Sequence, residues 1–191
     1  MGVHAESDDY DEAAALLEKG DYVAALARYR MLAERGSATA QVFLGWMHQL
    51  GRGVERDLEE AARWYKKAAD AGSAEGQFYL GTLLCNQEEY QQAIAWLERA
   101  ASQDYMPAIF RLGKMYDIGS GVTRDPEKAY RYLVRAARMG HLFAQRHIAG
   151  KMIRGRFGAK RIPEGLYNLG RVLWSAWRLA SRDRNSDRIR W

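Results

Sequence analysis

Apolar and small residues recur along the chain at intervals of three and four, which is the spacing of one face of an α-helix. One run includes Ala40, Leu44 and Met47. A second run begins at Ala61, after a polar stretch that contains two glycines. The chain has only three prolines in 191 residues and is rich in Ala, Leu, Arg and Glu, which favours helix throughout. The pattern predicts an all-α chain of short helix pairs.

The same pattern returns without a gap 68 residues further along the chain. Its most recognisable part is Gly-x-Gly-Val-x-Arg-Asp, which occupies residues 51–57 and again residues 119–125. A shorter copy lies between the two, and in it "CNQEEYQQA" replaces the double-glycine segment. Each of the three copies carries a Leu-Gly pair: Leu44-Gly45, Leu80-Gly81 and Leu112-Gly113. Self-similarity at this period indicates a repeat array.

The array is expected to cover residues 8–162, followed by a different C-terminal segment at residues 163–191. Its approximate units are 8–36, 37–72, 73–104, 105–140 and a degenerate unit at 141–162. Glycine in the middle of a helix costs about 1 kcal/mol relative to alanine. A Leu-Gly pair repeated there therefore predicts that the partner helix of each pair approaches too closely for a side chain.

The two double-glycine segments could be phosphate cradles or structural joints. A phosphate-binding loop needs a preceding strand and a defined glycine spacing or a Lys-Ser/Thr pair, and none of these is present. The segments instead combine a helix-ending glycine with a helix-starting aspartate. Asp57 has Glu60 three residues on, which predicts a capping box, and Asp125 precedes Pro126. We interpret both segments as joints, with positive φ at one or more glycines of each.

The pattern Ala-x3-Leu-Gly-x-Met-x3-Gly-x-Gly-Val-x2-Asp-x3-Ala-x2-Trp/Tyr-x3-Ala-Ala-x2-Gly resembles the Sel-one-like repeat, the longer cousin of the tetratricopeptide repeat. Residues 37–72 and 105–140 match it closely, while residues 73–104 look like a tetratricopeptide unit. The resemblance implies a right-handed α-solenoid of four to five antiparallel helix pairs, with the first helices lining a concave face. It also implies an adaptor or scaffold, since most members of the family serve other proteins in this way.

The function of a solenoid lies on its concave surface. On the first helices, the positions that are not used by the Leu-Gly packing are candidates for contact with a partner. They are Trp46, Gln49, Phe78, Thr82, Phe110, Lys114, Asp117 and Arg146. Trp46 and Lys114 stand at a position whose residue varies between copies, which favours binding. Phe78 and Phe110, like Val42, could instead fill the seams between repeats.

Little in the sequence points to catalysis, a metal or a cofactor. A single cysteine, Cys85, excludes a disulfide framework and a multi-cysteine metal site. The four histidines have no metal-ligand spacing, and His48 stands where the matching copy has the packing residue Tyr116. No Gly-x-Ser-x-Gly elbow occurs. We expect no catalytic or metal-binding residue and no cofactor, so the protein is not expected to be an enzyme.

The C-terminal segment differs in charge and pattern from the rest. Residues 151–191 hold 11 Lys and Arg against 3 Asp and Glu, whereas residues 1–150 hold 18 against 21. An apolar helix is expected from Pro163 to about Ser181, and its docking residues would be Leu173, Trp174 and Trp177. This helix could cap the solenoid, or it could dock on a partner protein or a membrane surface. Nucleic acid is disfavoured, because the basic stretch "KMIRGRFGAKR" has one aromatic residue and belongs to no known binding module.

The N-terminus has no secretory signal, and no apolar stretch is long enough to cross a bilayer, which predicts a cytoplasmic protein. The function expected from the sequence is a non-enzymatic protein–protein interaction scaffold that binds a peptide or protein partner on its concave face. The alternative is peripheral membrane or nucleic-acid association through the basic, Trp-containing C-terminal segment.

Overall fold

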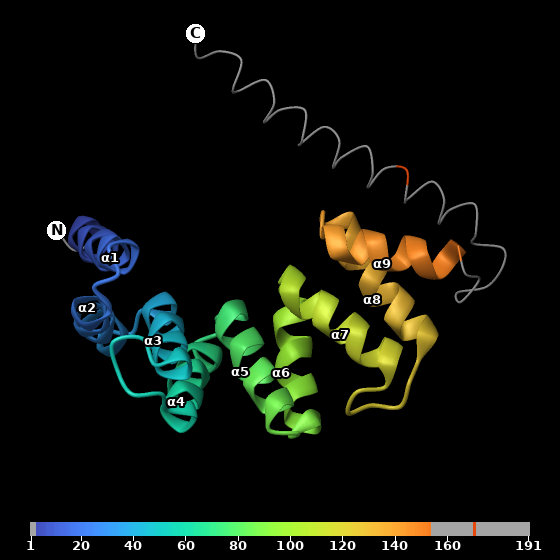
Figure 1. Cartoon of the computed structure of the whole chain (residues 1–191), viewed down its shortest axis with the longest axis horizontal. Coiled ribbons are helices and arrows are strands. Elements are labelled where there is room, and N and C mark those ends of the chain that lie inside the picture. The colour runs from blue at the N-terminus through green and yellow to red at the C-terminus, as the bar shows by residue number, and fades with distance from the viewer. Residues whose placement is uncertain (1–2, 154–169, 171–191) are drawn as a thin grey trace, which may run out of the picture. The chain divides into compact units, whose positions relative to one another are not determined.

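The computed structural model describes residues 3–153 and Gly170, and residues 3–153 contain nine α-helices and no strand. The chain divides into two compact units, residues 1–108 and 109–191, and the second unit holds most of α7 together with α8 and α9. The helices, labelled in Figure 1, are α1 (Val3–Glu18), α2 (Tyr22–Glu34), α3 (Ala38–Leu50), α4 (Leu58–Asp70), α5 (Ala74–Asn86), α6 (Tyr90–Ser102), α7 (Met106–Ile118), α8 (Pro126–Arg138) and α9 (Leu142–Ile153). The predicted all-α repeat solenoid is confirmed.

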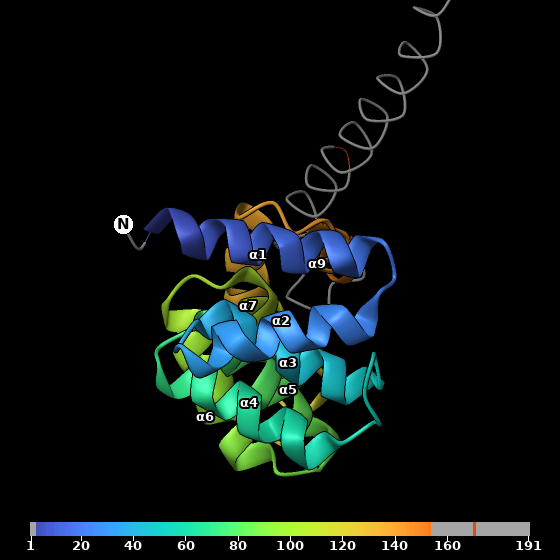
Figure 2. The same ribbon diagram turned by 90° about the vertical axis from the view of Figure 1, so that its left-hand side faces the viewer.

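In the first unit, each helix packs on the next one along the chain, from α1 to α6 (Figure 2). Helix α3 also contacts α5, so the first helices of two successive pairs lie side by side. Short connections favour antiparallel neighbours, which is the arrangement that the repeat pattern requires. In the second unit, α8 packs on α9.

Most helices begin at a residue whose side chain accepts a hydrogen bond from a backbone N–H of the first turn. These capping residues are Asp21, Ser37, Asp57, Ser73 and Asp125, which act through oxygen, and His141, which acts through Nδ1. Helix α6 differs, because Glu89 precedes it without such a bond. The sequence therefore specifies most helix starts locally, through oxygen-bearing residues at the N-cap.

The two Gly-x-Gly-Val-x-Arg-Asp segments have one geometry. All four of their glycines, Gly51, Gly53, Gly119 and Gly121, have positive φ. The arginine of each segment donates from Nε to a carbonyl seven residues earlier, Arg56 to Gln49 O at 3.2 Å and Arg124 to Asp117 O at 3.0 Å. The backbone N–H of the final aspartate bonds a carbonyl of the preceding helix at 2.9 Å in both copies. The interpretation of these segments as structural joints is confirmed.

The capping box predicted at Asp57 forms only in part. Asp57 Oδ1 accepts from the backbone N–H groups of Glu59 and Glu60, each at 2.9 Å. The reciprocal bond from Glu60 to the Asp57 N–H is absent from the described residues, and that part of the prediction is wrong. The Asp57 N–H is used by the His48 carbonyl, and the Glu60 carboxylate pairs with Arg63 Nε at 2.9 Å.

The glycine of each Leu-Gly pair lies against the second helix of its own pair. A Cβ at Gly45 would be 2.5 Å from Tyr65 Cε1, and one at Gly81 would be 2.9 Å from Leu97 Cγ. A Cβ at Gly113 would be 2.8 Å from Leu133 Cγ. The predicted close approach of the two helices is confirmed.

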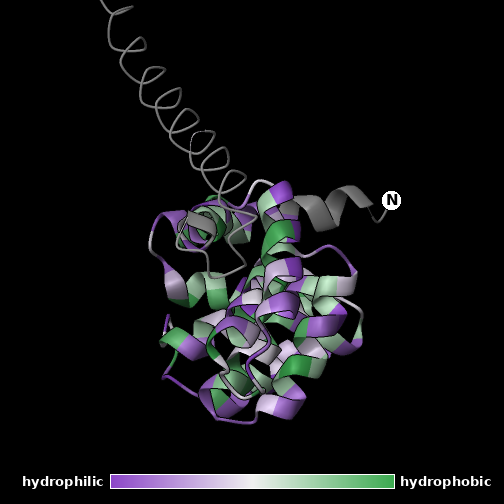
Figure 3. Ribbon diagram, turned by 90° about the vertical axis from the view of Figure 1, so that its right-hand side faces the viewer, coloured by the Kyte–Doolittle hydropathy of each residue, from purple (hydrophilic) through white to green (hydrophobic). Residues whose placement is uncertain are grey.

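The buried core follows the helix pairs. One cluster of the first unit joins Ala13 of α1 to Trp64 of α4, and a second includes Val42, Tyr65 and Leu80. Val42 is only 3% exposed, so it fills a seam rather than a groove. In the second unit, Leu133 and Ile148 form a cluster. Apolar and polar residues alternate within individual helices in Figure 3, as expected for helices with one buried and one exposed face.

Two predictions on the C-terminal segment remain predictions. The expected helix at 163–181 and its possible capping role fall outside the described residues, apart from Gly170, which is helical. The proposed boundaries of the repeat units also stay a prediction.

Candidate functional site

The eight residues expected to contact a partner lie on α3, α5, α7 and α9, which are the first helices of their pairs. In the first unit, Trp46 is half-buried and packs against the cluster that contains Tyr29 and Leu44. Gln49 accepts a hydrogen bond through Oε1 from the Tyr65 hydroxyl at 2.7 Å. Trp46 and Gln49 therefore support the packing of α3 while part of each side chain remains accessible.

On α5, Phe78 and Thr82 are also half-buried. The Phe78 ring lies 5.4 Å from the Tyr79 ring and 5.5 Å from the Tyr105 ring, measured between centroids. The Thr82 hydroxyl oxygen is buried without a hydrogen-bond partner among the described residues. Burial raises the pKa of Glu75 in the first turn of α5. This part of the first unit is therefore mainly aromatic, and the half-buried carboxyl of Glu75 lies on the same helix.

In the second unit, the structure brings three candidate residues together. Phe110 and Asp117 of α7 and Arg146 of α9 line one pocket of about 540 Å³. The other lining residues are Ile118, Phe143, His147, Gly150 and Lys151. Lys114 does not line this pocket, but its charge lowers the pKa of His147. The pocket therefore joins predicted contact residues of α7 and α9 in one place.

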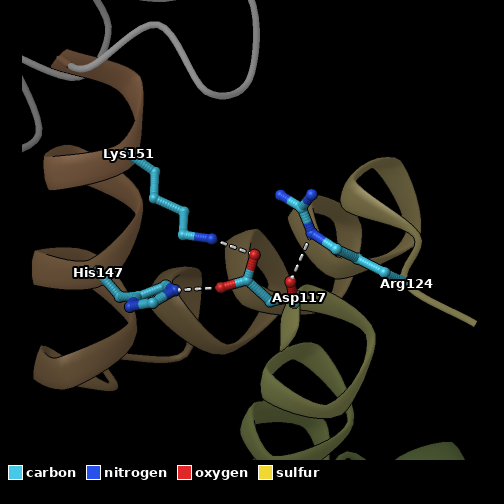
Figure 4. Close-up of polar contacts among 4 residues, drawn as sticks. All are labelled: Asp117, Arg124, His147 and Lys151. Carbon is cyan, nitrogen blue, oxygen red and sulfur yellow. Dashed lines mark hydrogen bonds and ion pairs between the residues drawn. The ribbon is translucent and has the colours of Figure 1, made fainter. Parts of the chain in front are cut away.

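Asp117 holds the pocket together through both oxygens of its carboxylate (Figure 4). His147 Nε2 lies 2.8 Å from Asp117 Oδ2, and Lys151 Nζ forms a short ion pair with Oδ1. The Asp117 carbonyl also accepts the Arg124 bond of the joint. The side chain of Asp117 is only 2% exposed. The buried carboxylate of Asp117 therefore ties the end of α7 to α9, and its backbone carbonyl ties the same end to the joint.

Hydrogen bonds from Lys151 and His147 keep the carboxyl group of Asp117 ionised. Burial alone would raise the pKa of its carboxyl, but the bonds from Lys151 and His147 outweigh burial and hold the pKa below its ordinary value. Asp117 is therefore ionised at neutral pH and can only accept hydrogen bonds. His147 must carry its proton on Nε2 to make this contact.

His147 is neutral at pH 7 in this arrangement. Burial lowers the pKa of the imidazole, and the hydrogen bond to Asp117 raises it by less than burial lowers it. Lys114 and Lys151 lower the pKa further through their positive charges. The pocket thus carries positive charge from Arg146 and Lys151 and one negative charge on Asp117.

The remaining walls of the pocket are apolar. The Phe110 ring stacks on the His141 ring, with centroids 4.1 Å apart. Phe143 is 72% exposed and Ile118 is 64% exposed. Large apolar side chains that are exposed together beside polar groups mark surfaces that bind another molecule.

Sequence reasoning predicted Arg146 but missed the other α9 residues of this site. His147 and Lys151 were not expected to take part, although their spacing of four places both on one helix face. His141, which directly precedes α9, and His147 within it have separate roles, since His141 Nδ1 accepts from the Ala144 N–H at 3.1 Å. Also unforeseen was a repeated bond in which Gln41, Gln77 and Gln145 each donate to a carbonyl eight residues earlier.

The other residues that the sequence suggested for a chemical or docking role are buried or fall outside the described residues. His48 is 5% exposed, and burial lowers the pKa of its imidazole. Cys85 is buried and is not part of a disulfide. No group of three or more His, Cys, Asp or Glu side chains within the described residues could hold a metal ion. No helix in that part of the chain has the length and apolar character needed to cross a membrane. Leu173, Trp174 and Trp177 fall outside the described residues.

These features define an all-α repeat solenoid with a charged, apolar-walled pocket on its first helices. Residues 38–73, 74–105 and 107–141 each match the Sel1 repeat. The chain belongs to the Sel1 repeat family.

Similar proteins agree with this assignment. A Sel1 repeat protein from Oxalobacter formigenes has 25% sequence identity and a TM-score of 0.75, over 88% of this chain and 68% of that one. A protective antigen of uropathogenic Escherichia coli with an SLR fold has 26% identity and a TM-score of 0.68, over 77% of this chain and 33% of the antigen. The mouse DAP3-binding cell death enhancer 1 is 28% identical over an alignment of 165 positions, which covers 65% of this chain and 32% of the mouse protein. The chain thus spans about a third of that relative.

Proposed function

We propose that this chain is a non-catalytic scaffold that holds a peptide or protein partner against the first helices of its repeats. The proposal rests on the pocket between α7 and α9. Phe110, Asp117 and Arg146 meet there beside the exposed side chains of Ile118 and Phe143. A folded protein gains little from exposing such groups together, and a bound partner would remove them from water.

The bonding of Asp117 supports a binding role over a catalytic one. A general acid or base must reach the group that reacts. Both oxygens of the Asp117 carboxylate are already bound by His147 and Lys151. The thiol of Cys85 is buried as well, whereas a reactive thiolate needs access to its substrate.

Family membership points the same way. Sel1 repeats form helical solenoids that typically serve as protein-interaction scaffolds. The name of the mouse relative describes a protein that binds DAP3. We take from it a protein-binding role for the repeat array, without that particular partner.

A pull-down with the full chain as bait tests the proposal. Partners recovered from the extract of its own cells should be lost when Trp46→Ala is combined with Lys114→Glu. The control is Arg131→Glu, which changes an exposed arginine on the second helix α8. Recovery that is the same for both variants would argue against the face of the first helices. Failure to recover any direct partner would contradict the scaffold proposal itself.

The alternative is association with a membrane surface or nucleic acid through residues 163–191. The excess of Lys and Arg in residues 151–191 favours it. Sedimentation with anionic vesicles and binding to duplex nucleic acid should be compared between the full chain and a variant with the Lys and Arg residues of 154–191 changed to Gln. A salt-sensitive signal that disappears in the variant would favour the alternative over the scaffold.

A further inference from the structure

We propose that the pocket of α7 and α9 docks an acidic segment of a partner protein, in which a carboxylate stands next to a bulky apolar side chain. The proposal rests on the scaffold function and names the class of segment that this part of the scaffold takes. It follows from the charges, the walls and the volume of the pocket.

The charges of the pocket favour a carboxylate. The two oxygens of the Asp117 carboxylate are used by His147 and Lys151, so its negative charge is already balanced inside the protein. Arg146 is exposed and has no hydrogen bond or ion pair within the described part of the chain. Lys114 adds a positive charge near His147. A guanidinium presents paired N–H donors that match the two oxygens of a carboxylate.

The walls of the pocket favour an apolar neighbour to that carboxylate. Phe143 and Ile118 expose most of their side chains, and Phe110 presents a ring that is fixed by its stacking on His141. Aromatic residues held in this way dominate the binding energy of many interfaces. The volume of about 540 Å³ lies within the range of roughly 300–1,000 Å³ typical of ligand pockets. An acidic side chain and one large apolar side chain would fit there together.

Charge also indicates whether the occupant of the pocket is a separate protein or another part of this chain. Residues 151–191 are strongly basic, with 11 Lys and Arg against 3 Asp and Glu, so Arg146 would repel them. The acidic N-terminal helix α1 of a second copy has the right sign. Its Asp9 and Glu12 are, however, paired with Arg35 and Arg28 at 3.0 and 2.9 Å. A separate acidic partner fits better than either.

A position-scanning library of synthetic peptides tests the proposal with the full chain. The library varies two adjacent positions over all residue types, and binding is read by fluorescence anisotropy. Peptides with Asp or Glu next to Phe, Leu, Ile or Trp should bind best, and their Gln and Lys counterparts should bind about tenfold more weakly. Added salt should weaken the acidic peptides selectively, because it screens exposed charges.

Two substitutions in the pocket, each with a matched control outside it, test whether the peptides bind there. Arg146→Glu should weaken the preferred peptides at least tenfold, while Arg131→Glu on α8 should leave them unchanged. Phe143→Ser should weaken them similarly, while Leu142→Ser, at the neighbouring exposed residue, should not. All four changes are at exposed positions and should leave the fold intact.

The outcomes separate this proposal from the scaffold function. A library without preference for acidic residues, or a preference that survives Arg146→Glu, would overturn the acidic-segment proposal. Partners recovered in the pull-down would then still support the scaffold. Preferred peptides that compete with a recovered partner would support both.

Discussion

Asp117 links three parts of the second unit through its side chain and its carbonyl. Taking a carboxylate and an ammonium out of water costs several kcal/mol for each ion, and only good hydrogen-bond geometry offsets this. Removal of one partner then leaves a buried group without its bond. Asp117 should for this reason matter to stability as well as to the pocket.

The stability of the second unit should depend on pH through this carboxylate. The pKa of Asp117 is lower in the folded chain than in the unfolded chain. Its contribution is therefore fully present above the unfolded value, and it is lost as pH falls through the folded value. The pKa of His147 is also lowered on folding, so protonation of the imidazole adds a further loss as pH falls below its ordinary value of 6.5.

Asp117→Asn tests this account of the carboxylate. We expect it to reduce the free energy of unfolding at neutral pH by about 1–3 kcal/mol, because the hydrogen bonds to Lys151 and His147 are weakened or lost. The variant should also lose less stability than the wild type between neutral and acidic pH. Urea unfolding at several pH values measures both effects. Parallel curves for the two proteins would contradict the role assigned to Asp117.

Gly53 is constrained by both its backbone and its surroundings. Its φ is +73°, and a Cβ there would lie 2.4 Å from the carbonyl oxygen of Tyr22. Gly72 has a φ of +89° but no heavy atom within 4 Å of an added Cβ. Gly72→Ala should lower the free energy of unfolding by about 1 kcal/mol, because only the left-handed backbone opposes the new side chain. Gly53→Ala should cost at least about 1 kcal/mol more, as measured by urea unfolding, and equal costs would show that the contact with Tyr22 is easily relieved.

The sequence predicted Phe110, Asp117 and Arg146 as contact residues because each occupies an equivalent position on the first helix of its repeat. It did not reach His147 and Lys151, which lie 30 and 34 residues from Asp117 in the chain. The unit that contains them is the most degenerate one, and the repeat pattern singled out only Arg146 in it. The pairing depends on how α9 packs, which only the structure supplies.

At the scale of the element, local chemistry predicted the joints well. The glycines and the final aspartate of each joint act through backbone conformation and first-turn hydrogen bonds, which the sequence specifies directly. The capping box was partly wrong because the Asp57 N–H had a competing partner on α3. The glutamine bonds between successive helices were missed because a buried amide is indistinguishable from an exposed one in the sequence.

The caps give an element-scale prediction. Asp125 Oδ1 accepts from the Lys128 N–H at 2.8 Å, whereas Glu89 makes no cap bond with its side chain. Asp125→Ala should lower the free energy of unfolding by about 0.5–2 kcal/mol. Glu89→Ala should change it by less than about 0.5 kcal/mol. Thermal or urea unfolding of the two variants measures this difference, and a larger loss for Glu89→Ala would contradict the assignment of the caps.

At the scale of the molecule, each helix of a repeat array packs mainly on its neighbours, so stability is approximately a sum of local terms. The fold class followed from the repeat alone, since the period and the Leu-Gly pairs define the helix pairs. The partner class did not follow, because it depends on which charges remain unbalanced after packing.

Because the stability of a repeat array is local, substitutions in one joint should reduce hydrogen-exchange protection only in nearby helices. Gly119→Val combined with Asp125→Ala should reduce hydrogen-exchange protection around residues 113–137 and largely spare residues 8–72. The reason is that contacts made by one joint stabilise its own helix pair and the next one. Uniform loss of protection along the chain would show stronger cooperativity than this, and an unchanged pattern would contradict the structural role of the joint.

Hydrogen exchange of the full chain with and without a saturating acidic–apolar peptide tests the binding proposal most directly. The peptide should slow exchange in α7 between residues 109 and 118 and in α9 between residues 142 and 151, while α2 and α4 exchange as before. Arg146→Glu should abolish this protection at the same peptide concentration. Protection confined to α2 and α4, or no protection at all under saturating conditions, would contradict a binding face built from the first helices.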